Sequence, residues 1–217
     1  MFHYEYVSKN EYAQTRKDVE ELIKLVQDEV RDNFTFSFEP IGSLSRNMVT
    51  QDINSNIGYD FDYNIYPNVD FDEYTPKKLK TIIMNAFNKY NKRFKYDNCE
   101  DSKRVITIKV KDKKNSKILH SCDFAIVRDW QDEDEYWHQD YIYFNKKQNT
   151  YEWQEQPDNY YDLPDKIDWC KENGLWQDVR DKYLTKKNNN KDISKKSRSI
   201  FAETINSVCN KNGYYEE

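Results

Sequence analysis

The chain has few aliphatic side chains and many aromatic ones, and this balance limits the kind of core it can build. Leu, Ile, Val and Phe make up about 21% of the 217 residues, close to the ~20% below which chains are commonly disordered. The chain also contains 18 Tyr, 11 Phe and 5 Trp residues. Each buried aromatic ring removes roughly 150 to 250 Å² from water, so these rings can complete a thin core. The sequence predicts a folded chain whose length favours one domain with a helical annex.

Composition excludes several classes of protein. No unbroken apolar run exceeds four residues, whereas a membrane-spanning helix needs about 18. The first residues lack the basic and apolar segments of a secretory signal, so we expect a cytoplasmic protein with no membrane partner. The four Cys and three His residues are too widely spaced for a zinc site. A net charge of -5 argues against a protein that binds long nucleic acid through its phosphates.

The hydrophobic pattern predicts an α+β fold, in which helices flank a mixed sheet. Apolar residues that recur every three or four positions predict helices. Alternating apolar and polar residues, in short segments bounded by Gly or Pro, predict strands. The C-terminal part is expected to be helical and packed on the core, which divides the chain into a core domain (1–155) and a helical part (156–217). The helices are expected at 15–34, 76–90, 164–173, 175–187 and 194–211, and the strands at 34–38, 59–66, 104–110, 117–127 and 139–144.

Two acidic residues share one face of a predicted strand. Asp60 and Asp62 alternate with Phe61 and Tyr63, so the period of two places both carboxylates on the same side. Carboxylates this close repel each other unless one is protonated or a cation lies between them. Hard oxygen ligands on a rigid strand suit Mg²⁺.

A third acid, Asp123, lies in an otherwise apolar predicted strand. If that strand neighbours the first, three carboxylates converge and can hold two metal ions. The alternative is a buried ion pair between Asp123 and Arg46 or Arg128. Asp112 and Asp129 are weaker candidates for the third ligand, since both lie near strand ends. Nearby His120 faces away from Asp123 and is expected to serve in packing or hydrogen bonding.

A short glycine-containing segment follows the first predicted strand. Gly42 permits a tight turn and close backbone approach to a phosphate, and Ser43 offers a hydroxyl and an N–H group. The segment therefore has the character of a phosphate-binding element.

The Gly-Ser pair with Arg46, the paired strand aspartates and the later strand aspartate resemble the motifs of the DNA polymerase beta-like nucleotidyltransferase superfamily, over about residues 34–127. The resemblance implies that Gly42, Ser43 and Arg46 contact a nucleoside triphosphate, ATP or GTP. It implies that the three aspartates are catalytic and bind two Mg²⁺ ions, or Mn²⁺ in their place, and that the third assists deprotonation of an acceptor hydroxyl. It also implies transfer of a nucleoside monophosphate to that hydroxyl, with release of pyrophosphate.

The spacing of the motifs is unusual for this superfamily. Between Ser43 and Asp60 lie 16 residues, more than in its compact members. Longer gaps occur in the branches that make oligonucleotides or cyclic nucleotides. We expect residues 48–56 to form a loop over the site.

A basic segment runs from Lys182 to Arg198 and is most simply a solvated helix and loop. By resemblance, Lys195 and Lys196 are candidate ligands of the triphosphate. The acceptor stays open at this point, as a small molecule, a nucleotide, a protein or an RNA end. Two other functions compete: a nucleotidyltransferase-like protein that binds a nucleotide or a partner without turnover, and a metal-dependent phosphodiesterase or nuclease. The Gly-Ser pair argues against the second of these.

Overall fold

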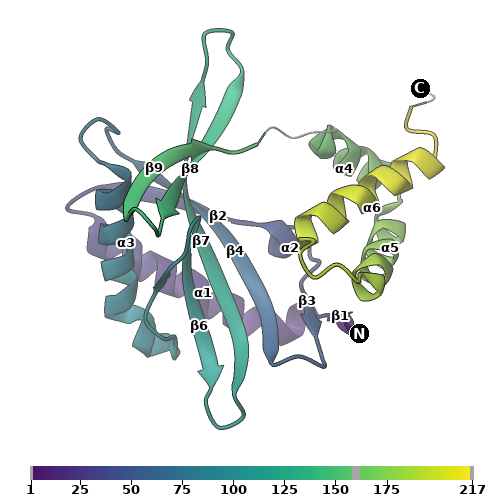
Figure 1. Ribbon diagram of the computed structural model, residues 1–217, viewed down its shortest axis with the longest axis horizontal. Helices are drawn as coiled ribbons and strands as arrows, with labels where there is room; N and C mark the ends of the chain where they lie inside the picture. Colours follow the sequence, from purple (N-terminus) through teal and green to yellow (C-terminus); the bar gives the residue numbers. More distant parts are fainter. Residues whose placement is uncertain (1, 158–161, 216–217) are drawn as a thin grey trace. The chain divides into compact units, whose positions relative to one another are not determined.

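The structure is a computed structural model that describes residues 2–157 and 162–215 (Figure 1). Its residues form two compact units. One unit contains Val7–Thr50 and Ser55–Gln156, and the other contains the residues before Val7, Gln51–Asn54 and the chain from Pro157 onward. The expected domain boundary at residue 156 lies beside residues 158–161, which are outside the described part together with residues 1, 216 and 217.

The larger unit is built on one mixed sheet, which confirms the α+β fold expected from the sequence. Strands β4 and β7 are parallel, and the other neighbouring strands are antiparallel. The hairpin expected from the sequence is formed by β6 and β7. The central order is β2 (Thr35–Ile41), β4 (Ile57–Asn68), β7 (Lys117–Gln131), β6 (Ile106–Asp112) and β5 (Glu100–Asp101), and β7 also pairs with β8 (Trp137–Asn145), which pairs with β9 (Thr150–Glu155).

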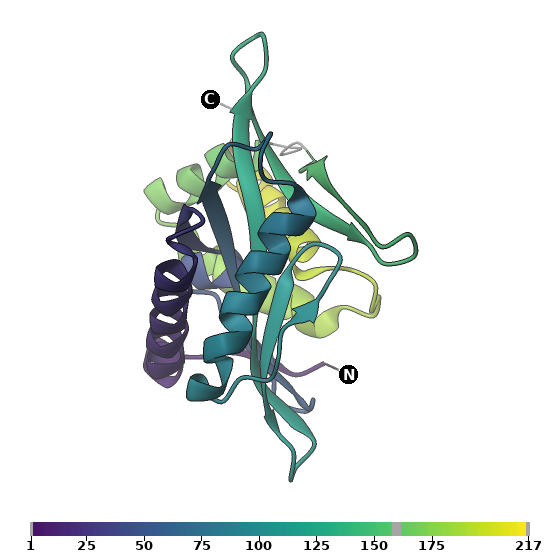
Figure 2. The ribbon, with the colours of Figure 1, turned by 90° about the vertical axis from the view of Figure 1, so that its left-hand side faces the viewer.

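Two long helices, α1 (Lys9–Val30) and α3 (Pro76–Tyr90), lie next to each other in this unit (Figure 2). Ser8 and Glu11 form a capping box at the start of α1, and Thr75 caps α3, which begins at Pro76. The short helices α2 (Gly42–Ser45) and η1 (Asn91–Phe94) complete the helices of this unit.

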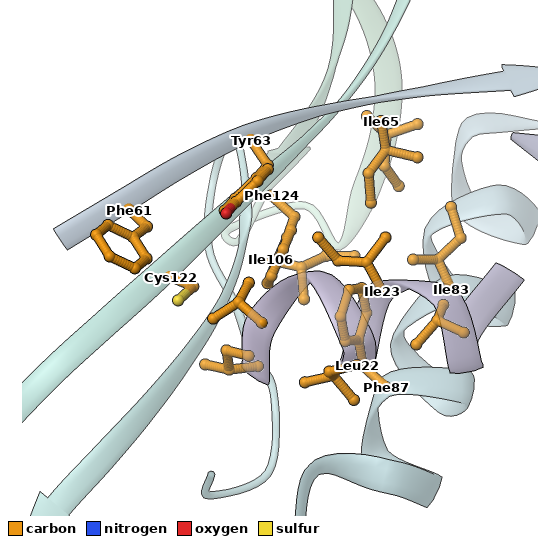
Figure 3. Close-up of a cluster of buried hydrophobic side chains, with 14 of the residues drawn as sticks. Leu22, Ile23, Phe61, Tyr63, Ile65, Ile83, Phe87, Ile106, Cys122 and Phe124 are labelled. Atoms are coloured by element: carbon orange, nitrogen blue, oxygen red, sulfur yellow. The ribbon is translucent and has the colours of Figure 1, made fainter. Parts of the chain in front are cut away.

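The main core lies between these two helices and one face of the sheet (Figure 3). Because side chains alternate along a strand, Phe61 and Phe124 of β4 and β7 point to this face, and Asp62 and Asp123 point to the opposite one. Aromatic rings fill much of the core, as the composition predicts. Its buried members include Leu22, Ile23, Phe61, Tyr63, Ile65, Ile83, Phe87, Ile106, Cys122 and Phe124.

Several boundaries differ from the sequence prediction. Helix α1 begins six residues earlier than expected, because Ser8 caps it. The sequence predicts that Pro40 and Pro67 end their strands, and this prediction is wrong. Both prolines lie within strands, where Pro40 pairs with Tyr63 and Pro67 pairs with Phe36. Both prolines lie where a strand has one neighbour, Pro40 on the edge strand β2 and Pro67 beyond the stretch of β4 that pairs with β7.

The smaller unit contains α4 (Leu163–Glu172), α5 (Trp176–Asn189) and α6 (Ser197–Lys211), as the helical pattern predicts. Gly174 separates the first two with a φ of +70°, a conformation that favours glycine. Strand β1 (Tyr4–Tyr6) pairs with β3 (Thr50–Asp52). The expected loop over residues 48–56 therefore contains a strand. In the described residues no helix is both long and apolar enough to cross a membrane.

Candidate active site

Three carboxylates meet on the polar face of the sheet. Asp60 and Asp62 project from β4, and Asp123 projects from the neighbouring strand β7, where it pairs with Asp62. One carboxylate oxygen from each residue lies within 4.8 Å of the other two. The parallel pairing of β4 and β7 thus brings together the three acids singled out in the sequence.

Gly58 makes this pairing possible. A Cβ atom at this position would lie 1.8 Å from the backbone oxygen of Leu119 on β7. Only a residue without a side chain allows the two strands to approach in the register that places Asp62 opposite Asp123.

Gly42 lies directly against the acids. Its φ is +62°, and a Cβ there would lie 2.7 Å from Oδ2 of Asp62. The preceding residue, Ile41, pairs with Asp62, which fixes the start of α2 beside the carboxylate. Ser43 and Arg46 belong to this same short segment. The glycine therefore leaves room beside Asp62 that any larger residue would fill.

Burial and mutual repulsion make these acids hard to ionise. Burial and, to a smaller extent, the charges of Asp60 and Asp123 together raise the pKa of Asp62 to about 7, against a lowering by the charge of Arg46. Burial and Asp60 raise the pKa of Asp123 to about 6. A cation bound among the carboxylates would remove this penalty. Three converging hard oxygen donors fit a divalent ion such as Mg²⁺.

Two hydroxyl groups that the sequence analysis missed hold the acids in place. Ser121 on β7 donates a hydrogen bond to Oδ1 of Asp60, and Thr107 on β6 donates one of 2.5 Å to Oδ1 of Asp123. Ser121 could have been found, because it precedes Asp123 by two residues and shares its face. Thr107 could not, since its position depends on the register between β6 and β7.

The remaining candidates occupy other roles. Arg128 pairs with Asp140 at 2.8 Å and so is not the partner of Asp123. His120 contacts the Tyr96 hydroxyl at 2.9 Å, consistent with a role in packing and hydrogen bonding. The two alternative candidates for the third metal ligand form hydrogen bonds elsewhere. Asp112 accepts hydrogen bonds from Asn115, and Asp129 accepts one from Gln139.

The two lysines expected at the triphosphate belong to the smaller unit. Lys195 forms an ion pair of 2.6 Å with Glu203, and Lys196 directly precedes α6. Their role at a nucleotide stays a prediction.

No protein-family model and no curated protein sequence matches the chain. Solved structures do match. The STING-associated c-di-GMP synthase CdnE of Capnocytophaga granulosa has a TM-score of 0.60 and 18% identity, covering 98% of this chain and 64% of that one. The cyclic AMP-GMP synthase DncV of Vibrio cholerae, in complex with nonhydrolyzable GTP, has a TM-score of 0.54 and 16% identity, with coverages of 88% and 52%. The CD-NTase CdnG of Bradyrhizobium diazoefficiens, in complex with GTP, has a TM-score of 0.52 and 14% identity, with coverages of 74% and 42%.

These similarities establish the fold. The chain has the nucleotidyltransferase fold, in the form found in the CD-NTases, which confirms the resemblance seen in the sequence motifs. It spans 42% to 64% of the length of these three structures.

Proposed function

We propose that the chain is a metal-dependent nucleotidyltransferase that transfers a nucleoside monophosphate from ATP or GTP to a hydroxyl group. The convergence of Asp60, Asp62 and Asp123 within 4.8 Å, beside the space left by Gly42, carries this proposal. Three carboxylates that repel one another are costly to maintain without a cation. A site for metal and phosphate gives this arrangement a function.

The residues take the following roles in the proposed reaction. Asp60, Asp62 and Asp123 hold Mg²⁺, which when bound neutralises phosphate charge and aligns the groups for in-line attack. Gly42 and Ser43 bind the triphosphate, since a backbone without a Cβ allows close approach. We also assign Arg46, Lys195 and Lys196 to binding of the nucleotide, as cations suited to phosphate.

The proposed reaction replaces one P–O bond of the α-phosphorus with another. The acceptor oxygen forms a bond to the α-phosphorus, and the bond from that phosphorus to the bridging oxygen breaks. The electron pair of the broken bond leaves with pyrophosphate. Asp123 assists by accepting the hydroxyl proton.

We propose further that the acceptor is a second nucleotide, so that the product is a linear or cyclic oligonucleotide. Two similar structures are a c-di-GMP synthase and a cyclic AMP-GMP synthase, and another holds DncV with the linear intermediate 5' pppA(3',5')pG. The 16 residues between Ser43 and Asp60 also fit the branches of the superfamily that make such products. Residues 1–155 would supply the catalytic core and residues 156–217 a helical part. We propose a cytoplasmic location.

The test incubates the purified chain with radiolabelled ATP and GTP, singly and together, with Mg²⁺ or EDTA. We expect Mg²⁺-dependent release of pyrophosphate and a product containing both labels or two copies of one. Asp60→Asn should abolish release. Asp70→Asn is the matched control, because Asp70 belongs to another Asp-x-Asp pair, where it accepts a hydrogen bond from the Asp72 backbone in a turn.

Each outcome separates the competing functions. Pyrophosphate release equal in wild type and Asp60→Asn would refute the proposal. Nucleotide binding that is indifferent to Mg²⁺, without turnover, would favour a binding protein of this fold. Cleavage of a nucleic acid or dinucleotide without NTP would favour a phosphodiesterase.

A further inference from the structure

A buried lysine lies outside the proposed catalytic groups. Lys80 on α3 is 1% exposed, and its Nζ contacts Oδ1 of Asp101 at 2.7 Å and the backbone oxygen of Ser102 at 2.8 Å. The Tyr151 hydroxyl donates a hydrogen bond of 2.6 Å to the other oxygen of Asp101. Burial lowers the pKa of Lys80, because a charged amine loses its hydration there. Such a costly group needs a structural or functional reason.

The contacts of Lys80 fix a segment that would otherwise be weakly held. Strand β5 contains only Glu100 and Asp101, and in the part of the chain that the structure describes it pairs with β6 alone. The backbone oxygen of the next residue, Ser102, accepts a hydrogen bond from Lys80. The backbone N–H of Ser102 donates to the Val105 oxygen at 3.1 Å. The buried amine therefore anchors both residues at the edge of the sheet.

Ser102 contacts a residue of the metal site. Its hydroxyl lies 3.3 Å from that of Thr107, and Thr107 donates its single hydroxyl proton to Oδ1 of Asp123. Because that proton is used, the Ser102 hydroxyl must be the donor to Thr107. The hydrogen bonds thus run in one direction, from Ser102 through Thr107 to Asp123.

We propose that Lys80, Ser102 and Thr107 are positioning residues that set the orientation of Asp123 for a divalent metal ion. The inference rests on the proposed function, since it assigns these residues to the same metal site. Thr107 donates a hydrogen bond to Oδ1 of Asp123 and so fixes the rotation of the carboxylate that would hold the metal. Lys80 acts from a distance, by keeping Ser102 where it can orient Thr107.

The chemistry of the chain suits this role. A lysine or arginine paired directly with Asp123 would neutralise its charge and compete with the metal. A hydroxyl group fixes the carboxylate and leaves its negative charge available. The cation is separated from the carboxylate by three hydrogen bonds, through Ser102 and Thr107, and its charge is balanced by Asp101.

The experiment measures Mn²⁺ affinity directly, by the EPR signal of free Mn²⁺, with no nucleotide or turnover. Loss of a residue that orients a metal ligand commonly weakens metal binding 10- to 100-fold, so we expect about tenfold weaker binding in Thr107→Val. Thr107→Ser should restore the affinity. Ser102→Ala should weaken binding about threefold, and should have no further effect in the Thr107→Val background. Thr150→Val, on the exposed part of β9, is the control and should bind Mn²⁺ like wild type.

Lys80 is tested by two variants. Lys80→Met keeps much of the side-chain volume and should weaken Mn²⁺ binding about as much as Ser102→Ala. Tyr151→Phe removes one hydrogen bond from Asp101 and keeps the ring. It tests the contact between Lys80 and Asp101 if Lys80→Met does not fold. Tyr151→Phe should weaken Mn²⁺ binding by less than Ser102→Ala does.

The outcomes separate this inference from the proposed function. If Asp60→Asn binds Mn²⁺ as wild type does, the proposed metal site is wrong. If Asp60→Asn loses binding while Thr107→Val keeps it, the positioning role is wrong and the metal site stands. Additive effects of Ser102→Ala and Thr107→Val would overturn the link between the two hydroxyls. Wild-type affinity in folded Lys80→Met, or in Tyr151→Phe where Lys80→Met does not fold, would overturn the role of Lys80.

Discussion

Adding one methyl group at Gly58 should disturb both the sheet and the acidic site. The Cβ of an alanine would lie 1.8 Å from the Leu119 oxygen, 2.6 Å from its carbonyl carbon and 3.0 Å from the Ile118 oxygen. Non-bonded carbon and oxygen atoms stay more than about 3 Å apart, so β7 would have to retreat by more than about 1 Å. All of these atoms belong to backbone, and no flexible side chain can move away to make room.

The expected loss of stability follows from this geometry. Overpacking in a well-packed region typically costs 1–3 kcal/mol, and backbone contacts place Gly58→Ala at about 3 kcal/mol. For a chain of this length, that corresponds to a fall in Tm of about 6 to 12 °C. Since the pairing places Asp62 opposite Asp123, we also expect weaker binding of Mn²⁺.

Thermal and urea unfolding, followed by circular dichroism, measure the stability, and EPR measures the Mn²⁺ affinity. Gly174→Ala is the control: its φ of +70° makes alanine unfavourable by about 1 kcal/mol, but nothing lies within 4 Å of the new Cβ. Gly174→Ala should leave Mn²⁺ binding unchanged. The reasoning is refuted if Gly58→Ala costs no more stability than Gly174→Ala, or if it keeps full Mn²⁺ affinity.

Three other predictions concern the charges and the turn at the site. Without divalent metal, the free energy of unfolding should fall by up to about 6 kcal/mol as the pH rises from about 4 to 7, because the pKa values of Asp62 (about 7) and Asp123 (about 6) in the folded chain exceed the ordinary value of 3.8. Asp62→Asn should flatten this dependence, measured by urea unfolding in EDTA. Gly42→Ala should lower stability by about 1 to 2 kcal/mol, since its φ is +62°, and should weaken Mn²⁺ binding about tenfold in the EPR assay. Arg128→Ala should cost about 3 kcal/mol in urea unfolding, because it leaves Asp140, 5% exposed, without its cation.

Each of these three predictions has an outcome that would contradict it. A metal-free stability that rises between pH 4 and 7 would contradict the reasoning on Asp62 and Asp123. Wild-type Mn²⁺ affinity in Gly42→Ala would show that the space beside Asp62 is unimportant for the metal. Asp140→Asn in the Arg128→Ala background should recover part of the lost stability, and no recovery would mean that the loss came from packing instead.

Much of the site could be predicted from the sequence because local periodicity determines it. The alternation around Asp60 and Asp62 fixes which face they share, and the surrounding apolar residues make Asp123 conspicuous. The adjacency of β4 and β7 depends on a crossover through residues 69–116, so pattern alone could only suggest it. The hydroxyl of Thr107 depends on the register of a hairpin that contains an irregularity at Val110 and Lys111.

The errors have physical causes as well. Pro40 and Pro67 were predicted to end their strands, because proline lacks the N–H that a strand interior requires. Each lies where only one neighbouring strand is present, and that position is known only once the sheet order is known. Strand β5 is two residues long and carries no pattern that could reveal it.

The helical unit is assembled from distant parts of the chain, and this affects the order in which it can form during synthesis. Asn188 receives the Tyr4 N–H at 2.6 Å and donates to the Tyr4 oxygen at 3.0 Å, so its side chain pairs with β1 much as a strand would. A ribosome makes Tyr4 184 residues before it makes Asn188. The sheet unit, whose last residue is Gln156, can fold in the meantime. Tyr4 therefore obtains this partner only after the intervening chain has been made, and truncation before Asn188 would leave the backbone N–H and C=O of Tyr4 without it.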